Sequence, residues 1–85
     1  MGLELVELMM AVEEEFNVTI DDEEAYEINT PGELLKSILT KQGSDDPYVK
    51  AERWDQLRWL IAEQLDVPLH EVTETAGFVR DLDAG

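Results

Sequence analysis

Residues 3–16 read LELVELMMAVEEEF, and this stretch decides the fold because its apolar residues recur with the period of an α-helix. It consists of good helix formers and contains neither glycine nor proline. At 100° per residue, five of its apolar side chains gather in one stripe, and such a stripe faces a hydrophobic core. The residues of this stripe are Leu5, Leu8, Met9, Val12 and Phe16.

The opposite side of this predicted helix has an apolar centre with an acidic border. A surface that only meets water does not need apolar residues at its centre. The combination suits a partner that is basic around a shallow apolar spot. This side comprises Leu3, Val6 and Met10, flanked by Glu7, Glu13 and Glu14.

Two shorter helices are predicted next. The acids of residues 21–24 begin a short helix that runs through about Ile28, because carboxylates favour the positive end of the helix dipole. Thr30-Pro31-Gly32-Glu33 then has threonine as N-cap, proline at the first helical position and glutamate three residues after the threonine. This pattern is a capping box, and it predicts a helix to about Lys41.

A polar loop over residues 42–47 separates these helices from a long helix, expected from about Val49 to Leu65. Trp59 falls outside the buried stripe of this helix. We interpret its ring as lying on neighbouring aliphatic stems or as covered by the following loop, with a binding role as the alternative. The sequence therefore predicts an all-α fold of three longer helices and one short helix.

The last twenty residues, 66–85, show little periodicity. Residues 67–72 suggest a turn or a single helical turn. Phe78, Val79 and Leu82 are predicted to anchor the segment to the helices. A loop of this length is unusual in a compact domain and usually has a function.

The charge of the chain is its clearest compositional signal. Eighty-five residues make one domain, residues 1–85, with a formal net charge of -15. No lysine or arginine precedes Lys36, whereas eleven acidic residues do. Such a surface repels nucleic acid and anionic membranes and favours basic partners, unless the acids serve solubility alone.

Several kinds of chemistry are not expected. The chain has no cysteine, so it has neither disulfides nor thiolate sites. No apolar run approaches the roughly 20 residues that span a bilayer and no leader sequence is evident, so a cytoplasmic protein is expected. His70 is the only histidine, and Asp81-x-Asp83-x-Gly85 matches only part of a calcium loop. Without a phosphate loop or a nucleophile with a histidine base, we predict neither an enzyme nor a metal site.

Read in the order 52–85 and then 1–41, the chain resembles an acyl carrier protein. Residues 3–16 are similar to the second helix of that family almost residue for residue, and residues 42–51 form a linker outside the resemblance. The other similar stretches are residues 54–67 for the first helix, 71–82 for the long loop after it, and 20–25 and 28–34 for the third and fourth helices.

The reversed order of the two halves implies a circular permutation of the acyl-carrier four-helix bundle. Residues 42–51 would then join the original ends. About eight residues reach at most roughly 27 Å, which is enough for helix ends on one side of a bundle. A permuted monomer is expected, and a dimer that exchanges its halves is the alternative.

The resemblance fails at one position. The family carries Asp-Ser-Leu at the start of its second helix, and phosphopantetheine is attached to that serine, whereas this chain has Met1-Gly2-Leu3. Gly2 has no hydroxyl group. Ser37 lies within the predicted fourth helix and Ser44 in the linker, so neither has the required setting, although Ser44 stays open as an unorthodox acceptor. No phosphopantetheine or other cofactor is expected on this chain.

The resemblance also implies that the helix of residues 3–16 recognises partners. We therefore predict a non-enzymatic acidic docking module of fatty-acid or polyketide-type metabolism that binds basic surfaces of acyl-processing enzymes. A functional carrier of acyl groups on phosphopantetheine is one alternative, and an unrelated interaction protein with the same fold is another. The predicted docking residues are Glu4, Val6, Glu7, Met10, Glu13 and Glu14.

Overall fold

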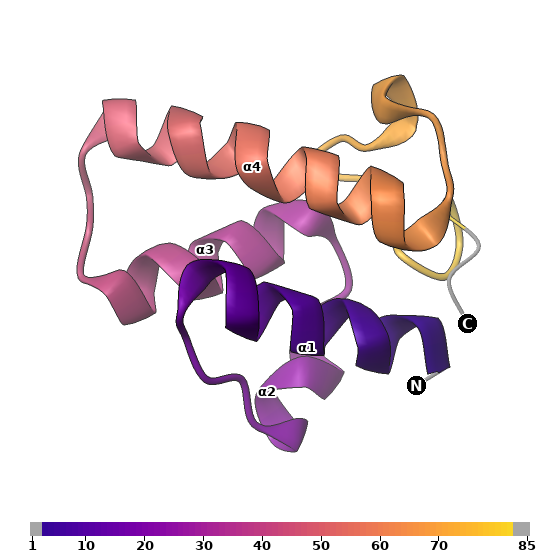
Figure 1. The fold of residues 1–85 in the computed structure, drawn as a ribbon, viewed down its shortest axis with the longest axis horizontal. Coiled ribbons are helices and arrows are strands. Elements are labelled where there is room, and N and C mark those ends of the chain that lie inside the picture. Colours follow the sequence, from indigo (N-terminus) through magenta and orange to yellow (C-terminus); the bar gives the residue numbers. More distant parts are fainter. Residues whose placement is uncertain (1–2, 83–85) are drawn as a thin grey trace.

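The computed structural model describes residues 3–82, and within them all regular structure is helical. This confirms the predicted all-α fold of three longer helices and one short one, which is consistent with an acyl-carrier-like bundle. Within these residues, no helix combines the length and the apolar character that crossing a membrane requires. The elements are α1 (Leu3–Phe16), α2 (Asp22–Glu27), α3 (Pro31–Gln42), α4 (Pro47–Leu65) and the short 3-10 helix η1 (Leu69–Glu71) (Figure 1).

The helices begin where side chains cap them. Asp21 accepts a hydrogen bond from the Glu24 N–H at 2.8 Å and so caps α2. Thr30 Oγ1 accepts from the Glu33 N–H at 3.2 Å and caps α3, as predicted. The Glu33 carboxylate accepts the return bond from the Asn29 N–H at 2.8 Å rather than from the Thr30 N–H, and it also accepts from the Thr30 hydroxyl at 3.4 Å. The capping box is therefore present, but its return bond is displaced by one residue.

α4 begins two residues earlier than predicted. Pro47 was assigned to the loop, yet it occupies the first helical turn, and Asp46 accepts a hydrogen bond from the Tyr48 N–H at 2.8 Å. Proline fits this position because its missing N–H would have no partner within the helix. Asp-Pro thus begins the helix instead of closing the loop.

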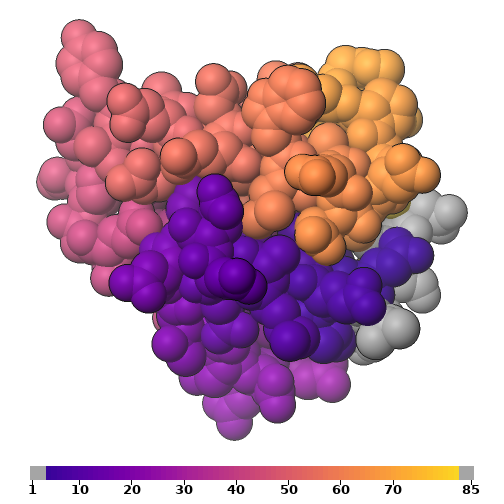
Figure 2. Space-filling model, viewed as in Figure 1, coloured from indigo at the N-terminus to yellow at the C-terminus, as the bar shows by residue number. Residues whose placement is uncertain are grey.

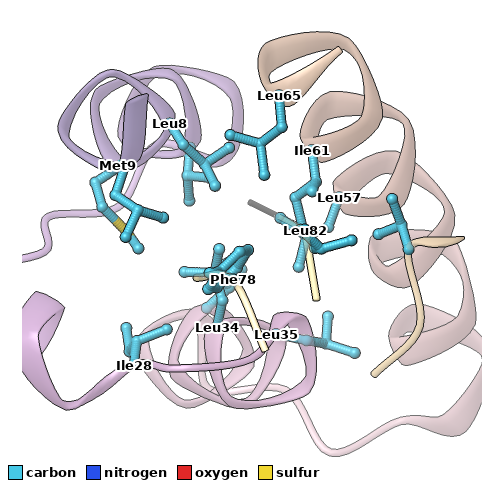
Figure 3. Close-up of a cluster of buried hydrophobic side chains, with 14 of the residues drawn as sticks. Leu8, Met9, Ile28, Leu34, Leu35, Leu57, Ile61, Leu65, Phe78 and Leu82 are labelled. Carbon is cyan, nitrogen blue, oxygen red and sulfur yellow. The ribbon is translucent and has the colours of Figure 1, made fainter. Parts of the chain in front are cut away.

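The buried apolar side chains form one core that α1, α3 and α4 enclose. All five residues of the predicted α1 stripe are buried. α4 packs against both α1 and α3. Figure 3 shows Phe78 and Leu82 between the three helices. The other helices contribute Leu34, Leu35 and Ile38 from α3 and Leu57, Ile61 and Leu65 from α4.

The segment after α4, residues 66–82, is held by single anchors. Phe78 and Leu82 are 1% and 2% exposed, which confirms two of the three predicted anchors. Val79 is 63% exposed, so the prediction that it is an anchor is wrong. The Phe78 N–H donates to the Asn29 carbonyl at 2.9 Å in a tight turn, and the next side chain points to solvent. Val72 is a further buried anchor that the sequence did not indicate.

A backbone contact joins this segment to the beginning of α3. The Gly32 N–H donates to the Glu74 carbonyl at 2.9 Å. A Cβ at position 32 would lie only 2.7 Å from that carbonyl oxygen. Position 32 therefore requires glycine because of close approach between two backbone segments.

Trp59 on α4 is 62% exposed, so the prediction that the following loop covers its ring is wrong. The alternative of a ring lying on neighbouring aliphatic stems stays a prediction.

Candidate functional site

The outward side of α1 is the predicted docking site. We call its six residues the acidic face: Glu4, Val6, Glu7, Met10, Glu13 and Glu14. Val6 is 43% and Met10 62% exposed, although both are apolar. Helix α1 runs across the front of the molecule in Figure 2, where this side is open to solvent. The side chain of Leu3, which the sequence placed on the same side, lies outside the described part of the chain.

Glu13 differs from the other members of the acidic face. It is half-buried, and its carboxylate accepts a hydrogen bond from the Ile20 N–H at 3.0 Å. Its carbonyl accepts from the Val18 N–H at 3.2 Å. Glu13 thus closes the turn that follows α1. Across residues 3–82, by contrast, no side-chain hydrogen bond or ion pair engages the exposed carboxylates of Glu4, Glu7 and Glu14.

Helix α2 extends the apolar centre of the acidic face. A shallow hollow of ≈ 240 Å³ lies between α1 and α2, and Val6, Met10 and Tyr26 contribute to its lining. Tyr26 is 68% exposed, and Asp22 adds a carboxylate at the rim. Sequence reasoning missed this contribution because α2 is too short for its periodicity to show which side faces α1.

The ion pairs of residues 3–82 lie on other elements than α1. Lys41 Nζ is 2.7 Å from Glu24 Oε1 between α3 and α2, and the second pair is Arg80–Asp81. Partial burial acts to raise the pKa of Glu24, but hydrogen bonds with Lys41 and Ser37 and the Lys41 charge outweigh it and lower the pKa. Within the described residues, the ion pairs therefore leave the carboxylates of the acidic face without a cation.

The described serines do not fit phosphopantetheine attachment. Ser37 is half-buried within α3, and its hydroxyl donates a hydrogen bond to the Glu24 carboxylate. Ser44 follows the end of α3, where its N–H donates to the Leu39 carbonyl at 3.1 Å, and Asp46 rather than Ser44 caps α4. Neither hydroxyl lies at the beginning of a helix. Met1 and Gly2, which match the attachment position of the family, lie outside the described residues.

The beginning of α1 lies next to the segment that ends the described chain. A hollow of ≈ 360 Å³ is lined by Leu5 of α1 together with residues 77–80 and 28–30. In Figure 1 the yellow C-terminal segment and the first turn of α1 lie on the same side of the bundle.

Among the described residues, the remaining candidates from the sequence do not come together in a site. His70 is exposed. The N–H of Gly77 donates to Asp81 Oδ2 at 2.7 Å, and this bond together with Arg80 lowers the pKa of Asp81. Asp83 and Gly85 of the calcium-like pattern lie outside the described residues. Within residues 3–82, no cluster of three or more histidine and carboxylate side chains is arranged to hold a metal ion.

Comparison with known proteins supports the family resemblance. The family model described as "Phosphopantetheine attachment site" matches residues 3–38. The chain is 50% identical over 41 residues to the acyl carrier protein of Wolinella succinogenes, covering 48% of this chain and 54% of that protein. It is 42% identical over 42 residues to the acyl carrier protein of Chlamydia caviae, covering 49% and 54%. No solved structure gives a match.

These matches support a phosphopantetheine-attachment type of domain and, within that class, the acyl carrier protein family. The chain spans about half the length of the curated relatives it matches. Because acyl carrier proteins are carriers, the relatives also support the prediction that the chain is not an enzyme.

Proposed function

We propose that this chain is a non-enzymatic acidic docking module with an acyl-carrier-like fold and without a phosphopantetheine serine of its own. Its setting would be fatty-acid or polyketide-type metabolism in the cytoplasm. The observation that carries this proposal is the acidic face of α1, whose apolar centre is open to solvent whereas the apolar stripe on the core side of the helix is buried. This face lies within residues 3–38, the part that the family model matches.

The chemistry of the acidic face specifies its partner. Exposed carboxylates at positions 4, 7 and 14 attract a basic surface, and Val6, Met10 and Tyr26 offer a small apolar contact at the centre. Charged rims of this kind speed association and select partners, whereas the desolvated centre supplies affinity. Basic surfaces of acyl-processing enzymes, such as synthases and transferases, fit this description.

Charge reversal tests this docking. The double variant Glu7→Lys, Glu14→Lys should lose binding to a basic acyl synthase or transferase in a pull-down, and wild-type binding should weaken as salt rises. The matched control is Glu52→Lys, Glu63→Lys, which makes the same charge change at exposed positions of α4. Equal loss of binding in both variants would show an effect of net charge rather than docking through α1.

The absence of an attachment serine has its own test. Incubation with coenzyme A and a phosphopantetheinyl transferase should leave the intact mass unchanged, because Gly2 offers no hydroxyl and Ser37 is engaged with Glu24. A mass increase would instead support the second candidate, a functional carrier, which the description of the matched family favours. Ser37→Ala and Ser44→Ala would then identify the acceptor.

We also propose that the chain is a circular permutant of the carrier fold. Two observations support this: the family model and relatives match one uninterrupted block of about half the chain, and residues 77–80 lie beside the beginning of α1. The bridge between the original ends would then lie within residues 42–51, of which 43–46 lie between α3 and α4. Joining the present ends and opening the chain at residues 43–46 should give a protein with the same circular dichroism and cooperative unfolding.

Failure of the rejoined chain to fold would contradict the permutation. The swapped dimer is distinguished by light scattering: the permuted domain should be monomeric at all concentrations, whereas exchanged halves give a stable dimer.

A further inference from the structure

A third hollow lies between α3 and α4 and shares no residue with the acidic face. Its volume is ≈ 350 Å³, and its lining comes from α3 along most of its length, the α3–α4 connection, the first turn of α4 and Glu74. In Figure 1 this connection links α3 to α4 at the left of the molecule. Leu39, Ser44, Lys50 and Glu74 of the lining lie outside residues 3–38, so this hollow belongs largely to the part of the chain that the family model does not match.

The charge of this hollow is opposite to that of the molecule. Lys36 on α3 and Lys50 on α4 both line it, against the single carboxylate of Glu74. The whole chain has only 6 lysines and arginines against 21 acids, so two lysines in one hollow are a local excess of positive charge. Neither lysine takes part in the ion pairs of residues 3–82.

The lining of the hollow is mixed, with an apolar side chain and a hydroxyl beside the lysines. Leu39 is partly exposed above the core, whereas Leu35 beneath it is 1% exposed. Ser44 is half-buried, and in the described residues its hydroxyl makes no hydrogen bond within the protein. The volume lies in the range of about 300–1,000 Å³ that is usual for small-ligand sites.

We propose that this hollow binds a small amphiphilic anion: a carboxylate attached to a short aliphatic chain. Lys36 and Lys50 would hold the carboxylate, Ser44 would donate a hydrogen bond to it, and the chain would lie against Leu39. The lysines come from two different helices, so a carboxylate placed between them could accept a hydrogen bond from each lysine, one at each oxygen. The proposal is independent of docking through α1, because the two surfaces share no residue.

Octanoate is a suitable probe, with backbone amide NMR spectra of the ¹⁵N-labelled protein as the readout. Titration should shift the amides of Leu39, Ser44 and Lys50 with saturation, while those of Val6 and Met10 stay in place. Octan-1-ol, which has the chain without the charge, should bind more weakly. Shifts confined to the α1–α2 hollow, or equal affinity for the alcohol, would overturn the proposal.

Lysine substitutions sharpen this test. Lys50→Gln should weaken octanoate binding about three- to fivefold, which is the loss expected for one partly exposed charge pair. Lys36 also borders a groove along α2 and α3, so Lys50 is the more specific position. Lys41→Gln is the matched control, because it removes the same charge from a lysine that is paired with Glu24. Equal weakening in both variants would mean that only net charge acts, and would overturn the site.

Discussion

The four helices and the segment of residues 66–82 are held in place in different ways. Each long helix presents a stripe of apolar side chains, so its burial is spread over several residues, as α1 shows with five. The segment relies on single residues, of which Phe78 and Leu82 reach the centre of the core. It also depends on two backbone hydrogen bonds, from Gly32 to Glu74 and from Phe78 to Asn29.

This difference shows where the fold is vulnerable. A helix keeps its hydrogen bonds within itself, so the loss of one side chain leaves it intact. The local bonds of the segment close only single turns, and the segment is positioned by contacts to the α2–α3 connection, α3 and α4 that are distant in sequence. Because the same segment lies beside the beginning of α1, its anchors also support the end of the acidic face.

Removing the central anchor should have the largest effect. Phe78→Ala deletes a ring that is 1% exposed, and the expected cost is about 3–5 kcal/mol of unfolding free energy. Val79→Ala, at the neighbouring exposed position, should stay within about 0.5 kcal/mol. Urea unfolding followed by tryptophan fluorescence measures both. If Phe78→Ala does not fold, Phe78→Leu should give an intermediate loss, and equal effects at positions 78 and 79 would contradict the anchor.

Closing the space between the segment and α3 should have the next largest effect. Gly32→Ala would ordinarily strengthen a helix by up to about 1 kcal/mol. Here the new Cβ would lie 2.7 Å from the Glu74 carbonyl oxygen, so we expect a destabilisation of about 1–3 kcal/mol. Gly77→Ala is the control, since its nearest neighbour would be Arg80 Cβ at 3.4 Å. Stabilisation by Gly32→Ala would show that the two backbones are not in contact.

The polar contact between α2 and α3 should contribute less to the stability of the fold, and its contribution should depend on pH. The pKa of Glu24 is lowered, so the folded state favours the carboxylate. Its contribution to stability is therefore present above the ordinary value of 4.5 and is lost as the pH falls through the lower folded pKa. Compared with Glu24→Gln, the wild type should gain at most about 1 kcal/mol at pH 7, and this gain should shrink below pH 4.5.

The control for this comparison is Glu27→Gln, which removes the same charge from an exposed position of α2. Because the protein carries a net charge of -15, either substitution relieves some general repulsion, and the difference between the two isolates the Lys41 and Ser37 contacts. A difference that does not change with pH would contradict the ion pair.

The smallest effect is expected at the junction between α4 and the segment. Asp66 ends α4 with φ 54, a left-handed conformation, and places a negative charge at the negative end of the helix dipole. Asp66→Asn keeps the shape, tolerates this conformation and removes the charge, so a gain of about 0.3–1 kcal/mol is expected. Asp55→Asn, at an exposed position within α4, should gain less in the same urea measurement.

Much of the helical structure of residues 3–65 could be predicted from the sequence, because helix periodicity and helix caps depend on residues close together in the chain. Periodicity identified the buried stripe of α1, and the Thr30 pattern identified the beginning of α3. Pro47 is predicted in the loop because Asp-Pro is common both in loops and at helix starts. Only the hydrogen bond that Asp46 accepts from the Tyr48 N–H identifies it as the start of a helix. Residues 66–82 could be recognised as aperiodic, but which of their side chains turn inward could not be predicted beyond Phe78 and Leu82.

The candidate sites also have parts that the sequence predicts and parts that depend on the tertiary structure. The exposed centre of α1 followed from helical geometry, whereas the addition of Tyr26 from α2 and the engagement of Glu13 by Ile20 depend on how the chain turns after α1. The lysine-lined hollow had no sequence signal, because Lys36, Lys50 and Glu74 are far apart along the chain.

The sequence by itself determined the charge, the absence of cysteine, the helices and the lack of a hydroxyl at Gly2, since these depend on composition and on contacts within a few residues. Only the tertiary structure decided that Val79 and Trp59 face solvent, that Gly32 has no room for a Cβ, and that two lysines share a hollow. The physical reason is that a side chain's burial and partners depend on distant segments, whose approach is set by the packing of the whole core.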